Sequence, residues 1–349
     1  MRRATPLAFF LFVAVTLNAQ HDRDRKITTF DVPNGFQTTP TAISPTGEIV
    51  GNYNDNATRE FRAFIRKPNG TFTTFDSPDG PSPTGVNSAG QIVGFYNSNP
   101  NNGPAQIGFL RNLNGSFAEI LPSGTNIYPL AINPIGEVVG RYVDEGQQVH
   151  GFIRSPNGKI TVLDFPNMGY PGTAIDTVNP IGQTAGFHSD IFDPIDGEEH
   201  GFIRQPDGRS TTFDPLNSTS TFPEAINAKG QIAGFYDVSG NSHGFVRDVD
   251  GNITTVDVSG AIDTLIYGID SAGAVAGYYR EGNGTLHGFL RDADGKTTTI
   301  DAPGSTHTSV VAINPSGEIV GMFLDSEGAM HGFVMMKPEH DDGGDHGHD

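Results

Sequence analysis

Residues 131–142 read AINPIGEVVGRY, and they are followed by HGFIR at 150–154 and by TVLD at 161–164. Versions of these three motifs occur seven times along the chain, always in the same order. The first motif occupies 42–53, 85–96, 131–142, 177–188, 225–236, 268–279 and 312–323; the second is centred on Phe64, Phe109, Phe152, Phe202, Phe245, Phe289 and Phe333; the third ends at 31, 76, 121, 164, 214, 257 and 301. The chain of 349 residues is therefore largely seven copies of one unit of about 45 residues, numbered 1 to 7 by the first motif.

Each unit is expected to form four β-strands. The first strand ends at the Ile-Asn pair, and Asn-Pro-x-Gly then makes a tight turn, because Pro presets φ and Gly adopts positive φ. Glu-Ile-Val-Gly-x-Tyr gives the second strand, His-Gly-Phe-Ile-Arg the third and Thr-Thr-Phe-Asp the fourth. β-Branched and aromatic residues fill these segments, and no helical period competes with them. A four-stranded meander that repeats in this way is typical of the blade of a β-propeller.

The two ends of the repeat predict a closed ring. The chain opens with a lone fourth strand at 26–31 and ends with a third strand near 331–335, so the last unit lacks its own fourth strand. If the first strand completes the last unit, two open sheet edges are removed. The sequence thus predicts an all-β, seven-bladed β-propeller of four-stranded antiparallel blades, closed by the N-terminal strand. A β-solenoid or a stack of hairpins is the alternative.

A basic residue and a carboxylate recur 14 residues apart, between the third and fourth strands of a unit. The pairs are Arg62 with Asp76, His150 with Asp164, His200 with Asp214, His243 with Asp257 and His287 with Asp301, and ring closure would bring His331 to Asp31. In unit 2 both partners are replaced together, by Ile107 and Leu121. Residues that face each other across a hairpin have Cβ atoms about 4.5–5.5 Å apart, which suits a charge-assisted hydrogen bond. We interpret the pairs as structural rather than catalytic or metal-binding, because a catalytic group is asymmetric and this motif recurs around the ring.

A secretory leader followed by seven His-Gly-Phe-Ile-Arg and Ala-Ile-Asn-x-x-Gly-x-Ile-Val-Gly units resembles the bacterial "probable extracellular repeat, HAF family". The family name reflects a His-Ala-Phe core; here Ala stands only at Ala63, and Gly replaces it in the other units. The resemblance covers nearly all of residues 26–336. It implies export and a repeated β-fold, and it transfers no activity, cofactor or catalytic residue.

The N-terminus predicts export. Arg2 and Arg3 precede an apolar run at 7–17, and Asn18-Ala19-Gln20 follows it. A basic start, a short apolar run and a small residue are typical of a secretory signal peptide, here cleaved after Ala19, with an uncleaved anchor as the alternative. The expected organisation is a signal peptide at 1–19, a short leader at 20–25, the propeller at 26–337 and a disordered acidic and His-containing tail at 338–349. The mature protein is expected to be secreted, either extracellular or periplasmic.

Composition limits the partners. The formal net charge is −19 and the chain has no Cys, so core packing rather than disulfides must stabilise a secreted fold. An acidic surface repels phosphate backbones, and nucleic acid is not an expected partner. The apolar run at 7–17 is shorter than the roughly 20 residues of a membrane span, and no other segment could cross a bilayer. We expect a monomer without a cofactor, with a glycan or a protein as its partner.

Candidate ligand-binding residues lie where the units differ. Loops between strands carry function in a propeller; those between the second and third strands and between units share one face, here called the loop face. On that face, the acidic loop 189–199 of unit 4 is the longest. The ligand-binding candidates are Tyr128, Tyr170, His188, Asp190, Asp193 and Asp196. A tolerated surface insertion is the alternative. In the tail, His340, His346 and His348 are weak metal-binding candidates.

The sequence favours a binding role over catalysis. It contains no Gly-x-Ser-x-Gly elbow, no His-Glu-x-x-His motif and no phosphate loop, and no catalytic residue is assigned. We expect a secreted, non-catalytic scaffold that recognises a glycan or protein through its loop face near units 2 to 4. The alternatives are a polysaccharide-acting hydrolase or lyase with an acidic site in the same place, and a purely structural surface protein. Convergent carboxyl or His groups with shifted pKa values in a cleft would favour the enzyme.

Overall fold

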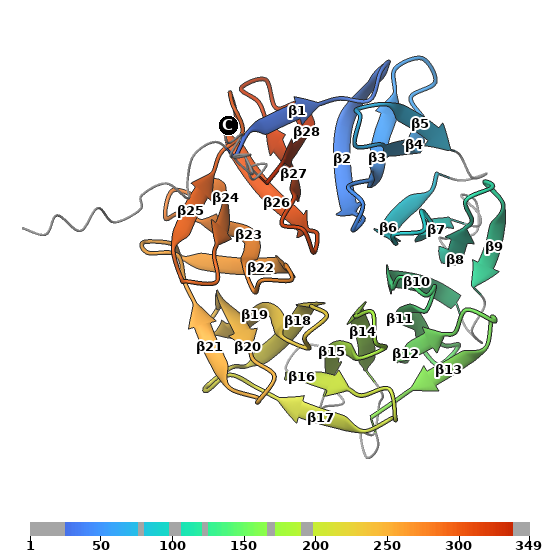
Figure 1. The fold of residues 1–349 in the computed structure, drawn as a ribbon, viewed down its shortest axis with the longest axis vertical. Coiled ribbons are helices and arrows are strands. Elements are labelled where there is room, and N and C mark those ends of the chain that lie inside the picture. The colour runs from blue at the N-terminus through green and yellow to red at the C-terminus, as the bar shows by residue number, and fades with distance from the viewer. Residues whose placement is uncertain are drawn as a thin grey trace, which may run out of the picture.

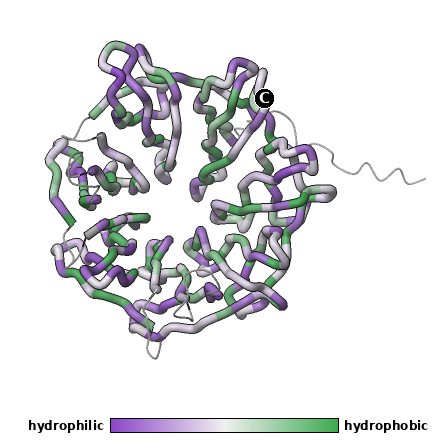
Figure 2. The backbone as a smooth tube through the Cα atoms, turned by 180° about the vertical axis from the view of Figure 1, so that it is seen from behind, coloured by the Kyte–Doolittle hydropathy of each residue, from purple (hydrophilic) through white to green (hydrophobic). Residues whose placement is uncertain are grey.

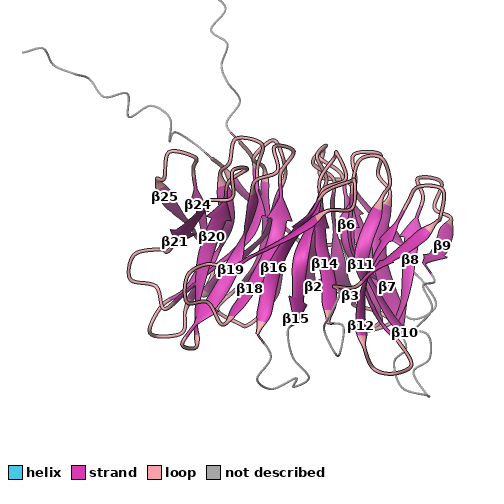
Figure 3. Cartoon of the chain, turned by 90° about the horizontal axis from the view of Figure 1, so that it is seen from below, coloured by secondary structure: helices cyan, strands magenta, loops and turns pink. Residues whose placement is uncertain are grey.

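The computed structural model describes residues 25–75, 80–97, 106–120, 125–165, 172–189 and 198–337. These residues form 28 β-strands and no helix. Figure 3 shows the described chain as strands joined by loops. Accordingly, the described part of the chain contains no helix long and apolar enough to span a membrane.

The strands follow the predicted units. Strand β1 (Ile27–Phe30) comes first; unit 1 has β2 (Gly35–Ile43), β3 (Ile49–Asp55), β4 (Phe61–Arg66) and β5 (Phe72–Phe75); unit 2 has β6 (Ser82–Val86), β7 (Ile92–Asn97), β8 (Gln106–Arg111) and β9 (Phe117–Ile120); unit 3 has β10 (Thr125–Ile132), β11 (Val138–Val143), β12 (Val149–Arg154) and β13 (Ile160–Leu163). Unit 4 has β14 (Thr173–Val178), β15 (Thr184–Ser189), β16 (Glu199–Arg204) and β17 (Ser210–Phe213); unit 5 has β18 (Ser220–Ile226), β19 (Ile232–Val238), β20 (Asn241–Arg247) and β21 (Ile253–Val256); unit 6 has β22 (Asp263–Ile269), β23 (Val275–Arg280), β24 (Leu286–Arg291) and β25 (Thr297–Ile300); unit 7 has β26 (His307–Ile313), β27 (Ile319–Leu324) and β28 (Met330–Met335).

Each unit is an antiparallel meander. Five sheets have four strands, and a sixth has eight because one parallel bridge, between Glu199 and Ser220, joins units 4 and 5. The sheets stand around a central space with the first strand of each unit innermost (Figure 1). Hydrophobic stretches are spread over all the sheets around this space (Figure 2).

The first and last strands of the chain pair with each other. Strand β1 lies antiparallel to β28, with Ile27 opposite Met335 and Phe30 opposite Gly332, in a sheet ordered β1-β28-β27-β26. The guanidinium of Arg66, in unit 1, lies 4.8 Å from the centre of the Phe30 ring. The N-terminal strand therefore supplies the fourth strand that unit 7 lacks, and it also contacts unit 1.

The hydrophobic core is divided among the gaps between units. Seven clusters of buried side chains are found in the described residues, and each joins two neighbouring units. The cluster between units 7 and 1 contains Phe30, Val320 and Val334 on one side and Ile49 and Phe64 on the other. The central phenylalanine of the His-Gly-Phe-Ile-Arg motif is fully buried in every unit; these residues are Phe64, Phe109, Phe152, Phe202, Phe245, Phe289 and Phe333.

The turn asparagines connect neighbouring units as well as closing their own turns. In unit 3, Asn133 Oδ1 accepts the backbone N–H of Glu137 at 2.9 Å, and Asn133 Nδ2 donates to the backbone carbonyl of Asn179 in unit 4 at 3.2 Å. Asn87, Asn179, Asn227 and Asn314 make the same contact with the next unit at 3.0–3.1 Å. The sequence predicts the turn but not this second bond, which satisfies a buried amide between units.

Every unit has a β-bulge in its innermost strand. The register between the first two strands shifts by one residue at the same place in all seven units. Opposite each bulge stands the glycine of the Ile-Val-Gly motif, where an added Cβ would overlap a carbonyl oxygen of the innermost strand; these residues are Gly51, Gly94, Gly140, Gly186, Gly234, Gly277 and Gly321. The motif requires glycine because the two backbones approach too closely for any side chain.

This close approach predicts the effect of a single methyl group. Gly277→Ala would force the Cβ against the carbonyl oxygen of Leu265, and we expect a destabilisation of about 1–3 kcal/mol, as in other overpacked cores. The matched control is Gly282→Ala in the same unit, where a Cβ meets only Ile262 at 3.8 Å. Denaturant unfolding measures both. Equal stability of the two variants would contradict the close approach.

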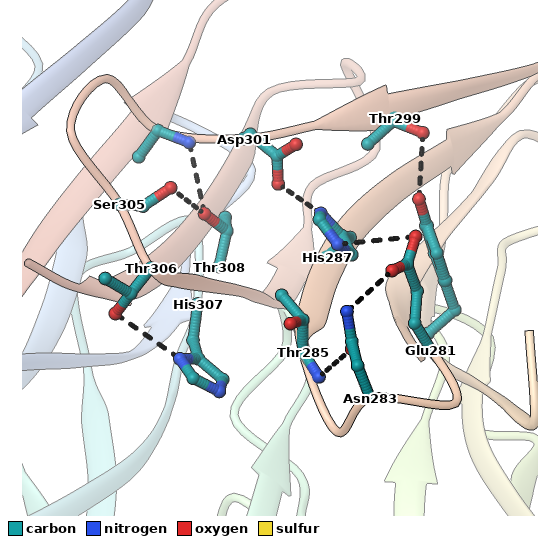
Figure 4. A network of polar contacts seen from close by, with 12 residues as sticks. Glu281, Asn283, Thr285, His287, Thr299, Asp301, Ser305, Thr306, His307 and Thr308 are labelled. Carbon is teal, nitrogen blue, oxygen red and sulfur yellow. Dashed lines mark hydrogen bonds and ion pairs between the residues drawn. The ribbon is translucent and has the colours of Figure 1, made fainter.

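The His–Asp pairs are hydrogen-bonded. The Nδ1 atoms of His150, His200, His243, His287 and His331 lie 2.7–3.1 Å from the carboxylates of Asp164, Asp214, Asp257, Asp301 and Asp31. Three of the rings also approach a second carboxylate with Nε2: His150 with Asp144, His287 with Glu281 and His331 with Asp325, at 3.2–3.7 Å. Figure 4 shows His287 between Asp301 and Glu281. The sequence spacing predicts the first partner and not the second.

The pair of unit 1 lies partly outside the described residues. Arg62 contacts Glu60 at 2.9 Å. Its predicted partner Asp76 lies outside the described residues, as does Leu121 of unit 2.

The pair at β1 predicts a pH-dependent contribution to stability. Burial lowers the pKa of His331, but the hydrogen bonds and charges of Asp31 and Asp325 outweigh burial and raise this pKa overall. The stabilisation is therefore complete below the unfolded pKa of about 6.5 and is lost as pH rises through the folded value. His331→Gln should lower the thermal midpoint by about 1–3 °C more at about pH 5.5 than at about pH 8.5, the size expected for a partly exposed pair.

Calorimetry at the two pH values measures this difference. His307→Gln is the control, because the His307 ring bonds the Thr306 hydroxyl at 3.4 Å rather than a carboxylate. The same midpoint loss for His331→Gln at both pH values would contradict the charged pair.

Candidate functional site

The residue added by the bulge differs from unit to unit. It is Thr41, Thr84, Leu130, Asp176, Glu224, Tyr267 and Val311 in units 1 to 7. A bulge redirects its side chain, and bulges are common beside functional sites. In units 1 and 2 the bulged threonine donates to a carbonyl of the next innermost strand, for example from Thr41 to Pro83 at 2.8 Å. Units 4 to 6 instead place two carboxyl groups and a phenol at this position.

Asp176 and Glu224 form an acidic pair. They occupy the bulges of the adjacent innermost strands β14 and β18, and each keeps part of its surface open to water. Burial raises the pKa of Asp176 to about 7, and the charge of Arg141 opposes the rise. Burial first, and then the charge of Asp176, raise the pKa of Glu224 to about 8, again against Arg141. The two carboxyl groups therefore retain a proton between them at neutral pH.

Arg141 links the pair to a predicted site residue. It lies on β11 opposite Tyr128 of β10, and its guanidinium is 5.7 Å from the centre of the Tyr128 ring. That ring also meets Phe95 edge-on at 5.1 Å, and its hydroxyl donates to Gln106. The structure thus brings Tyr128 into the neighbourhood of the acidic pair, on an innermost strand rather than on a loop.

A continuous series of aromatic rings borders the pair. Phe187 contacts Phe222 at 5.3 Å between ring centres, and Phe222 contacts Phe235 at 5.0 Å. Phe235 then contacts Tyr267 at 6.2 Å, and Tyr267 stacks on Tyr278 at 5.6 Å. Burial, then Tyr278 and Glu224, raise the pKa of Tyr267, so its phenol stays neutral. All five rings are half-buried, which leaves part of each surface open to a ligand.

A cavity of about 380 Å³ adjoins Tyr267 and Tyr278. Residues of β26, β27 and β28 close its other side, including Ser309, Val311, Met322 and Met330. Most of the lining side chains are apolar, with His307, Ser309 and the two tyrosines as the polar members.

Two members of the site lie at the predicted loop face. Gln106 and Met330 are the first residues of third strands, directly after loops of that face. Gln106 accepts the Tyr128 hydrogen bond, and Met330 lines the cavity. The site extends over units 3 to 7, whereas the sequence predicts a site near units 2 to 4.

His188 does not join this site. Its side chain is 4% exposed, stacks on Phe165 at 4.2 Å between ring centres, and lies 3.2 Å from the Thr212 hydroxyl. It fills the place that Tyr or Phe takes in other units, so its difference from them reflects packing and not ligand contact. This burial is at odds with its prediction as a ligand-binding residue.

The remaining predicted residues lie outside the described residues. They are Tyr170, Asp190, Asp193 and Asp196 of unit 4 and His340, His346 and His348 of the tail. Among the residues that the structure describes, no group of three or more His, Cys, Asp or Glu could hold a metal ion.

Sequence reasoning missed Arg141, Asp176, Glu224, Tyr267 and Tyr278. A signal was available, because the residue two places before the Ile or Val that ends the first strand reads Thr, Thr, Leu, Asp, Glu, Tyr and Val along the seven units. Two carboxyl groups and a phenol at neighbouring copies of one position set units 4 to 6 apart from the other units.

Comparison with known proteins identifies the fold. No family model and no curated protein matches the chain. Its structure is similar to virginiamycin B lyase from Staphylococcus aureus, at 12% identity and a TM-score of 0.59, covering 89% of this chain and 99% of that one. It is also similar to the β-propeller domain of the Trilobed protease from Pyrococcus furiosus, at 11% identity and a TM-score of 0.61, covering 88% and 95%. At these identities the similarity shows the fold alone: the chain is a β-propeller.

The acidic pair predicts a loss of stability toward alkaline pH. A carboxyl group whose folded pKa is raised stabilises the fold while protonated, and this contribution is lost as pH rises from about 4 through the folded value. Glu224→Gln removes the excess negative charge and leaves Asp176 with Arg141. The variant should therefore melt about 2–4 °C above the native protein at about pH 8.5, with no difference near pH 5.

Thermal unfolding at both pH values tests this expectation. The control is Glu327→Gln, which removes an exposed carboxylate on a turn and should change neither midpoint. A Glu224→Gln midpoint at or below that of the native protein at the higher pH would refute the raised pKa.

Proposed function

We propose that the protein is an exported, seven-bladed β-propeller, closed by its first strand, that binds a ligand at the innermost strands of units 3 to 7 without catalysis. The seven repeated units and the pairing of β1 with β28 support the closed ring. The basic and apolar leader at 1–19 supports export.

The acidic pair beside the aromatic series carries the binding proposal. Half-buried aromatic faces from Phe187 to Tyr278 offer stacking surface, and Arg141, Asp176 and Glu224 offer hydrogen bonds and charge next to it. The cavity beside Tyr267 and Tyr278 adds a concave surface, and concave, mostly apolar sites with a few polar groups are typical of ligand recognition. Stacking with charged hydrogen-bonding groups suits a sugar ring or a protein side chain.

A polysaccharide-acting hydrolase or lyase is the second candidate. The raised pKa values of Asp176 and Glu224 favour it, because one protonated and one ionised carboxyl group could serve as general acid and general base. In that case Asp176→Asn or Glu224→Gln would abolish product formation while leaving substrate binding largely intact.

Binding and catalysis can be tested together. The purified protein is applied to a glycan array, and polysaccharides are incubated with it and examined for released products. We expect binding without products, and Phe222→Ala should weaken that binding about tenfold, as the loss of one stacked ring does.

Phe61→Ala, which removes an exposed ring from β4, is the matched control and should leave binding unchanged. Released products would establish the enzyme in place of the scaffold. Neither binding nor products would remove glycans as ligands, and equal weakening by both Phe variants would place the binding surface elsewhere.

A further inference from the structure

The charges at the site do not balance. Asp176 and Glu224 together can carry two negative charges, whereas Arg141 is the cation whose charge reaches both of them. That guanidinium also lies over the Tyr128 ring, so it is shared among three neighbours. When both carboxyl groups are ionised, one negative charge has no countercharge within the site.

Other ionisable groups on the neighbouring strands have partners of their own. Strands β15, β16, β19 and β22 pack against β18. On them His188 lies against Phe165 and Thr212, His200 bonds Asp214, Glu199 accepts from Ser220, Asp237 accepts from Ser242, Asp263 bonds Arg280, and Arg204 donates to the carbonyl of Gln205. Strand β14, which carries Asp176, also packs against β10, β11 and β12, and on β12 His150 bonds Asp164 and Arg154 donates to the carbonyl of Ser155. The charges that the structure places on the acidic pair are therefore those of Arg141 and of the pair itself, with the neutral phenol of Tyr267 beside Glu224.

The acidic pair and the apolar cavity share a wall. Tyr267 occupies the bulge of the next innermost strand after that of Glu224. The charge of Glu224 helps to raise the pKa of the Tyr267 phenol. The same residue lines the cavity, together with Tyr278 and the apolar side chains of Val311, Met322 and Met330. A ligand that extends across Tyr267 would place one end beside the carboxyl groups and the other end among the apolar side chains of the cavity.

Aromatic rings at the junction favour a cation. The faces of aromatic rings attract positive charge, and rings combined with carboxylates form cages for ammonium groups. Tyr267 provides such a face beside Glu224, whose charge helps to raise its pKa, and Phe235 and Phe222 continue the series of rings from it. We propose that the site binds a ligand bearing an ammonium group on an apolar body, with the ammonium beside Asp176 and Glu224 and the apolar body in the cavity between units 6 and 7. This proposal rests on the binding function proposed above and specifies the ligand's chemistry.

Proton release distinguishes this ligand from others. An ammonium group next to the two carboxyl groups favours their ionised forms, so binding expels the proton that the empty pair retains. By linkage, affinity for a cation rises with pH through the range in which the pair titrates, about pH 6 to 8.5. A neutral or anionic ligand would show the opposite dependence or none.

Isothermal titration calorimetry of the whole protein tests the proposal with three probes that share one skeleton: phenylbutylamine, phenylbutanol and phenylbutyrate. We expect the amine to bind at least about tenfold more tightly than the alcohol, and the carboxylate to show no binding. Amine affinity should increase between about pH 6 and 8.5, and titrations in buffers of different ionisation enthalpy should show proton release. Equal affinity for amine and alcohol, or tighter amine binding at the lower pH, overturns the proposal.

Two variants test which part of the site contacts each end of the ligand. Glu224→Gln should remove the preference for the amine, and Val311→Phe, which fills the cavity, should weaken all phenyl probes. Glu327→Gln, an exposed carboxylate on the turn after β27, is the matched control and should bind as the native protein does. Unchanged amine binding in both site variants would place the amine elsewhere and overturn the proposal.

Glucosamine oligomers separate the failure of this proposal from that of the binding function. These oligomers carry ammonium groups without an apolar body. If they bind and phenylbutylamine does not, the apolar half is overturned while the binding function stands. If neutral glycans bind and neither amine does, the cationic specificity alone is overturned.

Discussion

The structure depends on the close approach of two backbones in every unit. At the glycine of Ile-Val-Gly, the second strand passes so near the first that a Cβ would overlap a carbonyl oxygen, as at Gly140 and Tyr128. The innermost strand accommodates this approach with a bulge, and the bulge turns one side chain per unit out of the regular alternation. The same constraint that fixes the glycine therefore also creates the position at which Asp176 and Glu224 stand.

Contacts between units complete this arrangement. A sheet of four strands with a buried face on each side is stable only against its neighbours, and the seven clusters lie between units for this reason. The turn asparagines add a bond from each of five units to the next. In unit 6, Asp270 replaces asparagine and uses its carboxylate for its own turn, while the backbone N–H of Ser271 reaches Pro315 at 3.3 Å.

The features that could be predicted are those with a short-range cause. Turn chemistry and alternation place the strands, and hairpin spacing places His150 against Asp164, because both act over a few residues of known geometry. The bulge could not be predicted, because it results from two backbones meeting and not from the preference of either strand. The second role of Asn133 was hidden for a related reason: an asparagine that suits a turn gives no sign that its amide also reaches Asn179 in the next unit.

A repeat protein separates structural from functional residues, but variation alone does not identify the functional ones. His188 and Asp176 both depart from the residues at equivalent positions in other units. His188 is buried against Phe165, and its imidazole replaces a tyrosine or phenylalanine ring within the same packing. Asp176 keeps an open surface, and its charge has no such packing role. Charge next to apolar surface is destabilising unless a partner compensates it. Arg141 compensates Asp176 and Glu224 only in part, because burial still raises the pKa of both carboxyl groups.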